Sequence, residues 1–224
     1  MIPARDAERY IGASIRSVLG QTHTPLEVIV VDDSETEATA DVVRGFGEPV
    51  RLLRRKRSGP AAARNIGVAE ARGRLIAFND ADDLWEPEKL AKQVALLDAR
   101  PDLAGCVTQV ELFWEDDVAW EEEAVRGTER AGIVPGWASI TLLARREAFD
   151  QIGPLDEDRV FSDAVEWFAR ARDSGLRIEL IEEPLVRHRR RAESLSRETG
   201  NSAEFLGLLR DRIERRREGG HESR

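Results

Sequence analysis

Cysteine is nearly absent from this sequence, and so is any long apolar run. Cys106 is the single cysteine among 224 residues, which excludes an intramolecular disulfide and a cysteine-based zinc site. Its apolar neighbours predict a position in the core. No stretch approaches the roughly 18 apolar residues that span a bilayer, and no secretory signal heads the sequence. These absences favour a cytoplasmic protein without a transmembrane segment.

Basic residues are too few for a general nucleic-acid-binding protein. Acidic residues outnumber basic ones by 43 to 34, giving a net charge of −9, whereas nucleic-acid binding favours a basic footprint. The charges are unevenly distributed, with an acidic stretch at 115–123 and basic stretches at 187–191 and 210–217. Hydrophobic residues make up 41% of the chain, which is enough for the core of one sizeable α/β domain.

Short apolar runs alternate with helical periodicity in the first hundred residues. Continuous apolar runs, typical of strands buried on both faces, occur at 26–31, 50–54 and 74–78. Helices are expected at about 6–19, 38–44, 60–71 and 87–98. Their predicted start signals are a capping box of Ser34 and Glu37 for the second helix, and Pro60 and Pro87 for the last two. This alternation predicts an α/β fold with a Rossmann-like, doubly wound and mostly parallel sheet covered by helices on both faces.

The pattern changes after residue 100. Further strands are expected at about 104–113, 139–144 and 177–181, and further helices at about 163–173 and 203–217. No flexible linker separates the two parts. We therefore interpret the chain as one domain with two halves, 1–100 and 101–200, followed by a charged C-terminal helix and tail, 201–224.

Aspartates follow two of the predicted strands. Asp32 and Asp33 end the strand in VVDDSE, and Asp80, Asp82 and Asp83 follow the strand in AFNDADD. Ligands of open α/β sheets gather at the carboxyl ends of strands, so these side chains are expected to face one crevice. Carboxylate oxygens suit Mg²⁺ or Mn²⁺. The alternative for the second group is an exposed acidic turn that caps the following helix.

Three segments carry a family resemblance: IPARDAERYIGASIRSVLGQT, LEVIVVDDSE and SGPAAARNIGVAEARGRLIAFNDADDLWEPEKL. In order and spacing they resemble the family 2 inverting glycosyltransferases of the GT-A fold, strongly over 1–100 and more loosely over 136–200. The resemblance implies transfer of a sugar, usually from a UDP-linked donor, with a divalent cation, Mg²⁺ or Mn²⁺, on the donor diphosphate. It also implies that 1–100 binds the nucleotide sugar and that 101–200 binds the acceptor.

The resemblance assigns roles to individual residues of the first half. Asp33 would hydrogen-bond the nucleobase, beside the backbone of Pro3 and Ala4. Asp82 would be the metal ligand, and Asp80 would contact the ribose or the metal, whereas Asp83 would orient the loop. Arg64 would lie near the nucleotide or its phosphates; its alternative is a surface ion pair of the i,i+4 type. Gly59 would permit the close approach of the loop before Arg64.

The catalytic position departs from the family pattern. The family carries a Glu-Asp pair at the start of a helix where this chain has FSDAVEWFARARDSG, so that Asp163 falls on the glutamate and Ala164 on the catalytic aspartate. Three interpretations stay open: Asp163 is the general base, Ala164 is an engineered substitution, or the natural chemistry is lost or altered. Glu166 is a candidate to share the catalytic role, its alternative being an ion pair with Arg170.

A second departure lies downstream, where relatives often have His-x-x-Asn-x-Ser. This chain has Arg191 at the histidine position and Ser194 at the asparagine position. Arg189 and Arg191 are candidates to neutralise the diphosphate, the alternative being a solvated basic loop. Trp137 is a candidate to stack on the acceptor, with Trp114 and Trp120 on the same rim; packing is the alternative for each tryptophan.

Two functional classes follow from these residues. The first is a metal-dependent glycosyltransferase that uses a nucleotide-sugar donor and an unidentified acceptor, with no nucleic-acid partner. The second, motivated by Ala164, is a catalytically impaired protein that binds the nucleotide sugar as a partner module. A nucleotidyltransferase is disfavoured because residues 3–12 contain no glycine-rich, basic phosphate loop.

Overall fold

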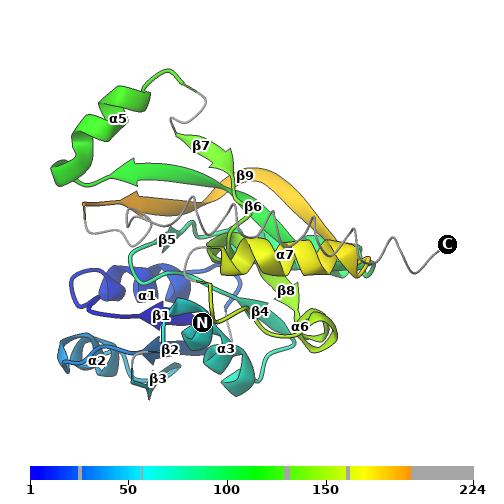
Figure 1. The fold of residues 1–224 in the computed structure, drawn as a ribbon, viewed down its shortest axis with the longest axis horizontal. Coiled ribbons are helices and arrows are strands. Elements are labelled where there is room, and N and C mark those ends of the chain that lie inside the picture. The colour runs from blue at the N-terminus through cyan, green and yellow to red at the C-terminus, as the bar shows by residue number, and fades with distance from the viewer. Residues whose placement is uncertain (25–26, 57, 129–131, 160–161, 193–224) are drawn as a thin grey trace.

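The computed structural model describes residues 1–24, 27–56, 58–128, 132–159 and 162–192 and contains two β-sheets with helices packed around them (Figure 1). The strands are β1 (Ile2–Ala4), β2 (Val28–Asp32), β3 (Val50–Arg54), β4 (Leu75–Ala77), β5 (Leu84–Trp85), β6 (Leu103–Trp114), β7 (Ile133–Pro135), β8 (Leu143–Arg145) and β9 (Arg177–Arg190). The helices are α1 (Ile11–Leu19), α2 (Ala38–Arg44), α3 (Pro60–Glu70), α4 (Lys89–Ala99), α5 (Ala119–Val125), α6 (Arg146–Ile152) and α7 (Asp163–Asp173). There are also two short 3₁₀ helices: η1 (Asp116–Val118) lies between β6 and α5, and η2 (Ser139–Thr141) lies between β7 and β8.

The first sheet is parallel, in the order β1-β2-β3. Every residue of β2 is buried, as expected for its continuous apolar run. Val28 and Val30 pack into the core cluster that contains residues of α1 and α2, whereas Ile29 and Val31 pack with Ala63 of α3. Because alternate residues of a strand point to opposite faces, helices cover both faces of this sheet, as predicted.

The second sheet is mixed, in the order β4-β8-β6-β9-β5, with β7 paired to β6. Among the described strands of this sheet, β6 and β9 form the one parallel pair, whereas β8 is antiparallel to both β4 and β6, β7 is antiparallel to β6, and β5 is antiparallel to β9. The α/β class is confirmed, but the expectation of a mostly parallel sheet is wrong for this half. Met1 connects the two sheets, since its nitrogen donates to Ala77 O and its carbonyl accepts from Asn79 N, each at 3.0 Å.

Helices also cover both faces of the second sheet. Cys106 and Leu143 share a core cluster with Leu90 and Leu97 of α4, which confirms the buried position predicted for Cys106. On the other face, Phe149 of α6 and Trp167 of α7 pack with ring centroids 4.7 Å apart. Trp167 is 1% exposed, so the core fixes α7 and with it the position of its first residue, Asp163.

Some local predictions are wrong because tertiary contacts compete with local ones. Ser34 does not cap α2; its hydroxyl donates to Asp32 and accepts from Asp6 N, while Glu37 pairs with Arg44 and Arg54. Of the strand expected at 139–144, the first part is η2 and only the end belongs to β8. The predicted helix at 203–217 lies outside the described residues. Among the described residues, no helix has the length and apolar character needed to cross a membrane.

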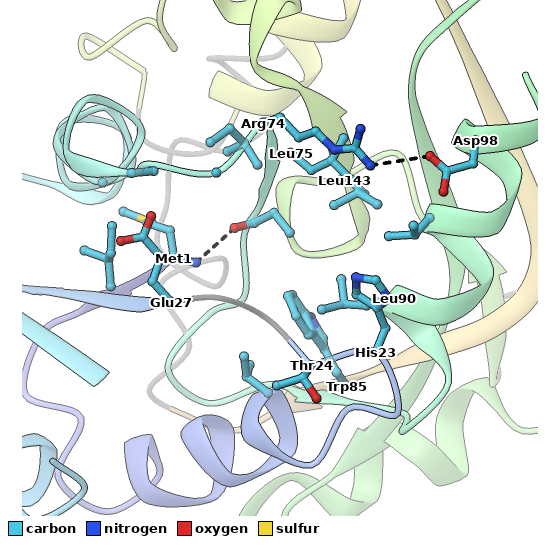
Figure 2. Close-up of a pocket in the computed structure, with 18 residues that line it drawn as sticks. Met1, His23, Thr24, Glu27, Arg74, Leu75, Trp85, Leu90, Asp98 and Leu143 are labelled. Atoms are coloured by element: carbon cyan, nitrogen blue, oxygen red, sulfur yellow. Dashed lines mark hydrogen bonds and ion pairs between the residues drawn. The ribbon is translucent and has the colours of Figure 1, made fainter. Parts of the chain in front are cut away.

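A largely apolar cavity of about 460 Å³ lies between the two sheets, beside Met1 (Figure 2). Its lining includes Ile29 of β2, Leu75 of β4, Trp85 of β5 and Leu90 of α4. None of the aspartates singled out from the sequence lines it. This cavity is therefore separate from the place where the aspartates after β2 and β4 lie.

Candidate active site

A cleft of about 690 Å³ opens at the carboxyl ends of the parallel strands. One wall consists of the ends of β1 and β2, the start of α3 and the loop after β4, which carry residues of the first half of the chain. The opposite wall consists of β6, β7, η2 and the start of α7, and the end of β9 reaches the same cleft. The predicted site residues that line it are Pro3, Ala4, Asp33, Arg64, Asp80, Asp82, Trp137, Asp163 and Arg191.

Asp33 lies at one end of the cleft, next to Pro3 and Ala4. Its Oδ2 accepts hydrogen bonds from the backbone nitrogens of Ser58 at 3.1 Å and Gly59 at 3.0 Å. Gly59 has φ +79, a left-handed conformation that favours glycine in this loop. Within the described chain, all hydrogen bonds to the Asp33 carboxylate go to Oδ2, so Oδ1 is left for a ligand. Asp32 is instead fully buried and contacts Ser34 and Arg54.

Arg64 joins the two walls of the cleft. It is 5% exposed, and its guanidinium donates to Asp80 Oδ1 at 2.6 Å and to Asp163 Oδ2 at 2.9 Å. Burial would lower the pKa of Arg64, but the carboxylates of Asp80 and Asp163 raise it above its ordinary value. The alternative of a surface i,i+4 pair is wrong, because both partners are distant in sequence. A buried guanidinium thus holds the loop after β4 against the start of α7.

The loop that carries Asp80, Asp82 and Asp83 is anchored through its last aspartate. Asp83 is fully buried; both of its oxygens lie 3.0 Å from His188 Nδ1, and Oδ1 also accepts from Arg189 N. Burial raises the pKa of Asp83, to about 6, against the opposing effect of His188. Asp83 therefore orients the loop, as expected, and its neighbours Asp80 and Asp82 line the cleft.

Asp80 and Asp82 each have one oxygen engaged by an arginine. Asp80 Oδ1 accepts from Arg64, and Asp82 Oδ2 accepts from Arg191 Nε at 2.9 Å. The hydrogen bonds of the described residues leave Asp80 Oδ2 and Asp82 Oδ1 for other ligands. No group of three or more His, Cys, Asp or Glu side chains in the described chain is arranged to hold a metal. This donor set fits a Mg²⁺ or Mn²⁺ ion that takes two carboxylates from the protein and its remaining ligands from substrate phosphates and water.

The start of α7 forms the other wall of the cleft. The side chain of Asp163, the first residue of α7, is 6% exposed. Burial raises the pKa of Asp163 above its ordinary value, and Arg64 opposes that shift. Ala164, at the position of the family's catalytic aspartate, also lines the cleft and contributes no acid there. Asp163 is therefore the acid that α7 presents to the cleft.

Glu166 does not share the cleft, which corrects the suggestion of a shared catalytic role. Both of its oxygens accept from Arg170 Nε, at 2.9 and 2.8 Å, and it is 6% exposed. Arg170 also donates to the carbonyls of Ile152 and Pro154, so this pair connects α7 to the end of α6. The predicted alternative, a pair with Arg170, is the observed one, although Glu166 is buried and Arg170 is partly buried rather than on the open surface.

Arg189 and Arg191 differ in position although both belong to the basic stretch. Arg191 lines the cleft. Arg189 does not: it pairs with Glu115 and lies over the rings of Tyr10 and Phe113, at 4.9 and 4.6 Å from the ring centroids. Arg189 also donates from Nε to Asp82 O at 2.9 Å, so these contacts hold it beside the cleft, and its contact with the diphosphate stays a prediction.

Sequence reasoning missed Tyr10 and His188, which both line the cleft. The ring of Tyr10, the single tyrosine of the chain, lies under the guanidiniums of Arg9, Arg189 and Arg191, at 5.0, 4.9 and 5.2 Å. No local signal could have found this contact, because about 180 residues separate Tyr10 from Arg191. His188 lies within the basic stretch at 187–191, but the sequence gave no indication of its contact with Asp83.

Trp137 lies on the acceptor-side wall predicted from the sequence. It is 44% exposed and meets the edge of Phe168 with ring centroids 5.5 Å apart. The surrounding wall is apolar and includes Val110, Leu112, Val134, Pro135, Ile140 and Val165. Trp114 and Trp120 do not line this cleft, so the expectation that they share its rim is wrong.

Comparison with known proteins agrees with this arrangement. The profile of the family described as Glycosyl transferase family 2 matches residues 1–152. The uncharacterized glycosyltransferase alr2836 of Nostoc sp. is 29% identical over 163 residues, which cover 66% of this chain and 50% of that protein. The chain spans half or less of the length of the first curated relatives it matches.

Two solved structures show the same fold. The S. aureus TarS 1-349 structure in complex with UDP aligns with a TM-score of 0.69 and 18% identity, covering 94% of this chain and 62% of that chain. The mannosyltransferase PcManGT from Pyrobaculum calidifontis, in complex with GDP-Man and Mn²⁺, aligns with a TM-score of 0.69 and 20% identity. That alignment covers 93% of this chain and 63% of the mannosyltransferase.

Proposed function

We propose a reaction on the premise that the chain belongs to glycosyltransferase family 2 and has an α/β GT-A fold. In this reaction, the protein transfers a sugar from a nucleoside-diphosphate donor, a UDP-sugar, to the hydroxyl group of an acceptor. The transfer proceeds with inversion and uses Mg²⁺ or Mn²⁺. One observation carries the proposal: a single cleft joins Asp33, the Asp80–Asp82 loop and Asp163, with Arg64 bound to both acidic walls.

The donor occupies the wall built from the first half of the chain. Asp33 Oδ1 accepts from the nucleobase, which lies beside the backbone of Pro3 and Ala4. Asp82 would hold the metal, Asp80 would contact the ribose or the metal, and Arg64 would lie near the nucleotide or its phosphates. A bound divalent cation would supply charge neutralisation for the departing diphosphate.

Asp163 acts as the general base in this proposal. Its carboxylate takes the proton of the acceptor hydroxyl as that oxygen bonds to the anomeric carbon, and the bond from that carbon to the diphosphate oxygen breaks. The electron pair of the broken bond leaves with the diphosphate, and attack from the opposite side inverts the anomeric centre. Burial supports this role because it raises the pKa of Asp163, and a carboxylate with a raised pKa is a stronger base.

A second candidate function has its own supporting observation. Ala164 stands at the family's base position, and the Asp163 carboxylate is already paired with Arg64. These two facts favour a module that binds a nucleotide sugar without transferring it. The two candidates share the donor site and differ in turnover, so the replacement of Asp163, argued in the Discussion, separates them.

Calorimetry with UDP tests the donor site that both candidates share. We expect UDP to bind in the presence of Mn²⁺ and to bind at least about tenfold more weakly with EDTA, because a metal held by Asp80 and Asp82 would neutralise charge on the diphosphate. Asp82→Asn should abolish the metal dependence, whereas Asp98→Asn, an exposed acid on α4 away from the cleft, should leave it unchanged. Equal UDP affinity with Mn²⁺ and with EDTA would reject metal-dependent donor binding.

Trp137 is proposed to contact the acceptor, because it is the exposed aromatic side chain of the cleft wall opposite the donor loop. We expect Trp137→Ala to raise the KM for aryl-glycoside acceptor probes roughly tenfold through loss of stacking, with UDP affinity unchanged. Trp120→Ala is the matched control, since Trp120 is 65% exposed on α5 and does not line the cleft. Equal KM values for the two variants would remove Trp137 from the acceptor site.

A further inference from the structure

We propose that Arg191 occupies the cation position at Asp82 until a nucleotide diphosphate binds, and thereby makes metal binding conditional on the donor. The inference rests on the proposed function, which assigns Asp80 and Asp82 to the metal. It goes further by giving Arg191 a defined action: it suppresses binding of a free divalent ion to the protein without nucleotide.

The position of Arg191 is fixed by contacts on two sides. Its Nε donates to Asp82 Oδ2 at 2.9 Å, and its guanidinium lies 5.2 Å from the centroid of the Tyr10 ring. Its side chain is 22% exposed and that of Asp82 is 20% exposed, so water only partly screens the pair. A positive charge therefore already lies beside the carboxylate that would bind a metal.

The neighbouring carboxylate of Asp80 is also compensated by a cation. It is paired with Arg64, whose Nη2 lies 2.6 Å from Asp80 Oδ1. Both aspartates assigned to the metal thus have a guanidinium partner within the described chain. A free Mn²⁺ ion would meet Arg191 at Asp82 and Arg64 at Asp80, and like charges that close repel one another.

A bound diphosphate changes this balance. It brings negative charges of its own, which can accept hydrogen bonds from the Arg191 guanidinium and ligate the metal at the same time. Arg191 is suited to such an exchange, because it lines the cleft and its fork of N–H donors matches phosphate oxygens. The metal and the nucleotide are therefore expected to bind together, with the guanidinium shared between Asp82 and the diphosphate.

The test measures Mn²⁺ binding by calorimetry and by the electron paramagnetic resonance signal of free Mn²⁺, with and without UDP. We expect Arg191→Gln to bind Mn²⁺ without UDP roughly tenfold or more tightly than the wild type, because one nearby positive charge is removed. Arg191→Lys keeps the charge and should resemble the wild type. Arg187→Gln is the matched control, since Arg187 lies near the end of β9, four residues before Arg191, pairs with Glu111 and does not line the cleft.

Two outcomes overturn the proposal, and they differ from each other. The first outcome is that the wild type binds Mn²⁺ when UDP is present, but that in the absence of UDP Arg191→Gln binds Mn²⁺ no more tightly than the wild type does. Arg191 then does not suppress metal binding, and the proposed function stands. If UDP binds and no variant takes up Mn²⁺ with or without it, the assigned metal site is wrong and this proposal fails with it. Circular dichroism verifies that each variant is folded.

Discussion

Asp163→Asn is expected to lower the rate of sugar transfer by about 10²- to 10⁴-fold, the usual contribution of a general base. The amide keeps the size of the side chain and can still contact Arg64, but it cannot take the proton of the acceptor hydroxyl. Binding of UDP with Mn²⁺ should change much less, because the proposed donor contacts lie on the other wall of the cleft. The measurement is turnover of UDP-sugars, including their slow hydrolysis, together with UDP calorimetry.

The matched control is Asp173→Asn, which makes the same chemical change at the exposed end of α7. It should leave turnover and UDP binding unchanged. If Asp163→Asn retains the wild-type rate within about a factor of ten, Asp163 is not the base. If the wild type itself turns over no UDP-sugar while binding UDP, the second candidate, a nucleotide-sugar-binding module, is the better description.

Arg64→Met is expected to lower the free energy of unfolding by about 3–5 kcal/mol, the usual cost of removing one partner from a buried ion pair. Arg64 is 5% exposed and Asp163 is 4% exposed, so the carboxylate left behind is largely shielded from water. The loss would leave Asp163 without its buried partner and would detach the Asp80 loop from α7. Urea unfolding followed by circular dichroism measures the change.

A double-mutant cycle controls for loss of packing. Because Asn carries no charge, Arg64→Met together with Asp163→Asn should destabilise the chain less than the sum of the two single changes, by about 1 kcal/mol or more. Arg64→Met within about 1 kcal/mol of the wild type would show that the buried pair contributes little to stability.

The sequence predicts what local chemistry determines. The apolar run of β2 forms the expected buried strand, and Pro60 opens α3 as predicted. The helix expected at 163–173 has those bounds, because its apolar face and its acidic first turn both lie within eleven residues. Aspartates that directly follow strands also reach the predicted edge of the sheet, since strand direction alone carries them there.

The partners of those aspartates could not be predicted, because each contact depends on how distant segments pack. Arg64 is 99 residues from Asp163, and Arg191 is 109 residues from Asp82. Glu166 and Arg170 are only four residues apart, yet the burial of their pair depends on α6. The capping-box prediction failed because the Ser34 hydroxyl bonds to Asp6 and Asp32 instead of capping α2. Local sequence does not reveal such competition.

The hydrogen bonds of Met1 between the two sheets have a practical consequence for anyone who prepares this protein. The amino group is buried, which lowers its pKa to about 5, and it lies beside the cavity in Figure 2. A bulky group attached to that nitrogen would have to fit beside this cavity or displace the hydrogen bond to Ala77 O. A purification tag or a fluorescent label attached there would compete with core packing, so such groups are better attached at exposed side chains such as those of α5.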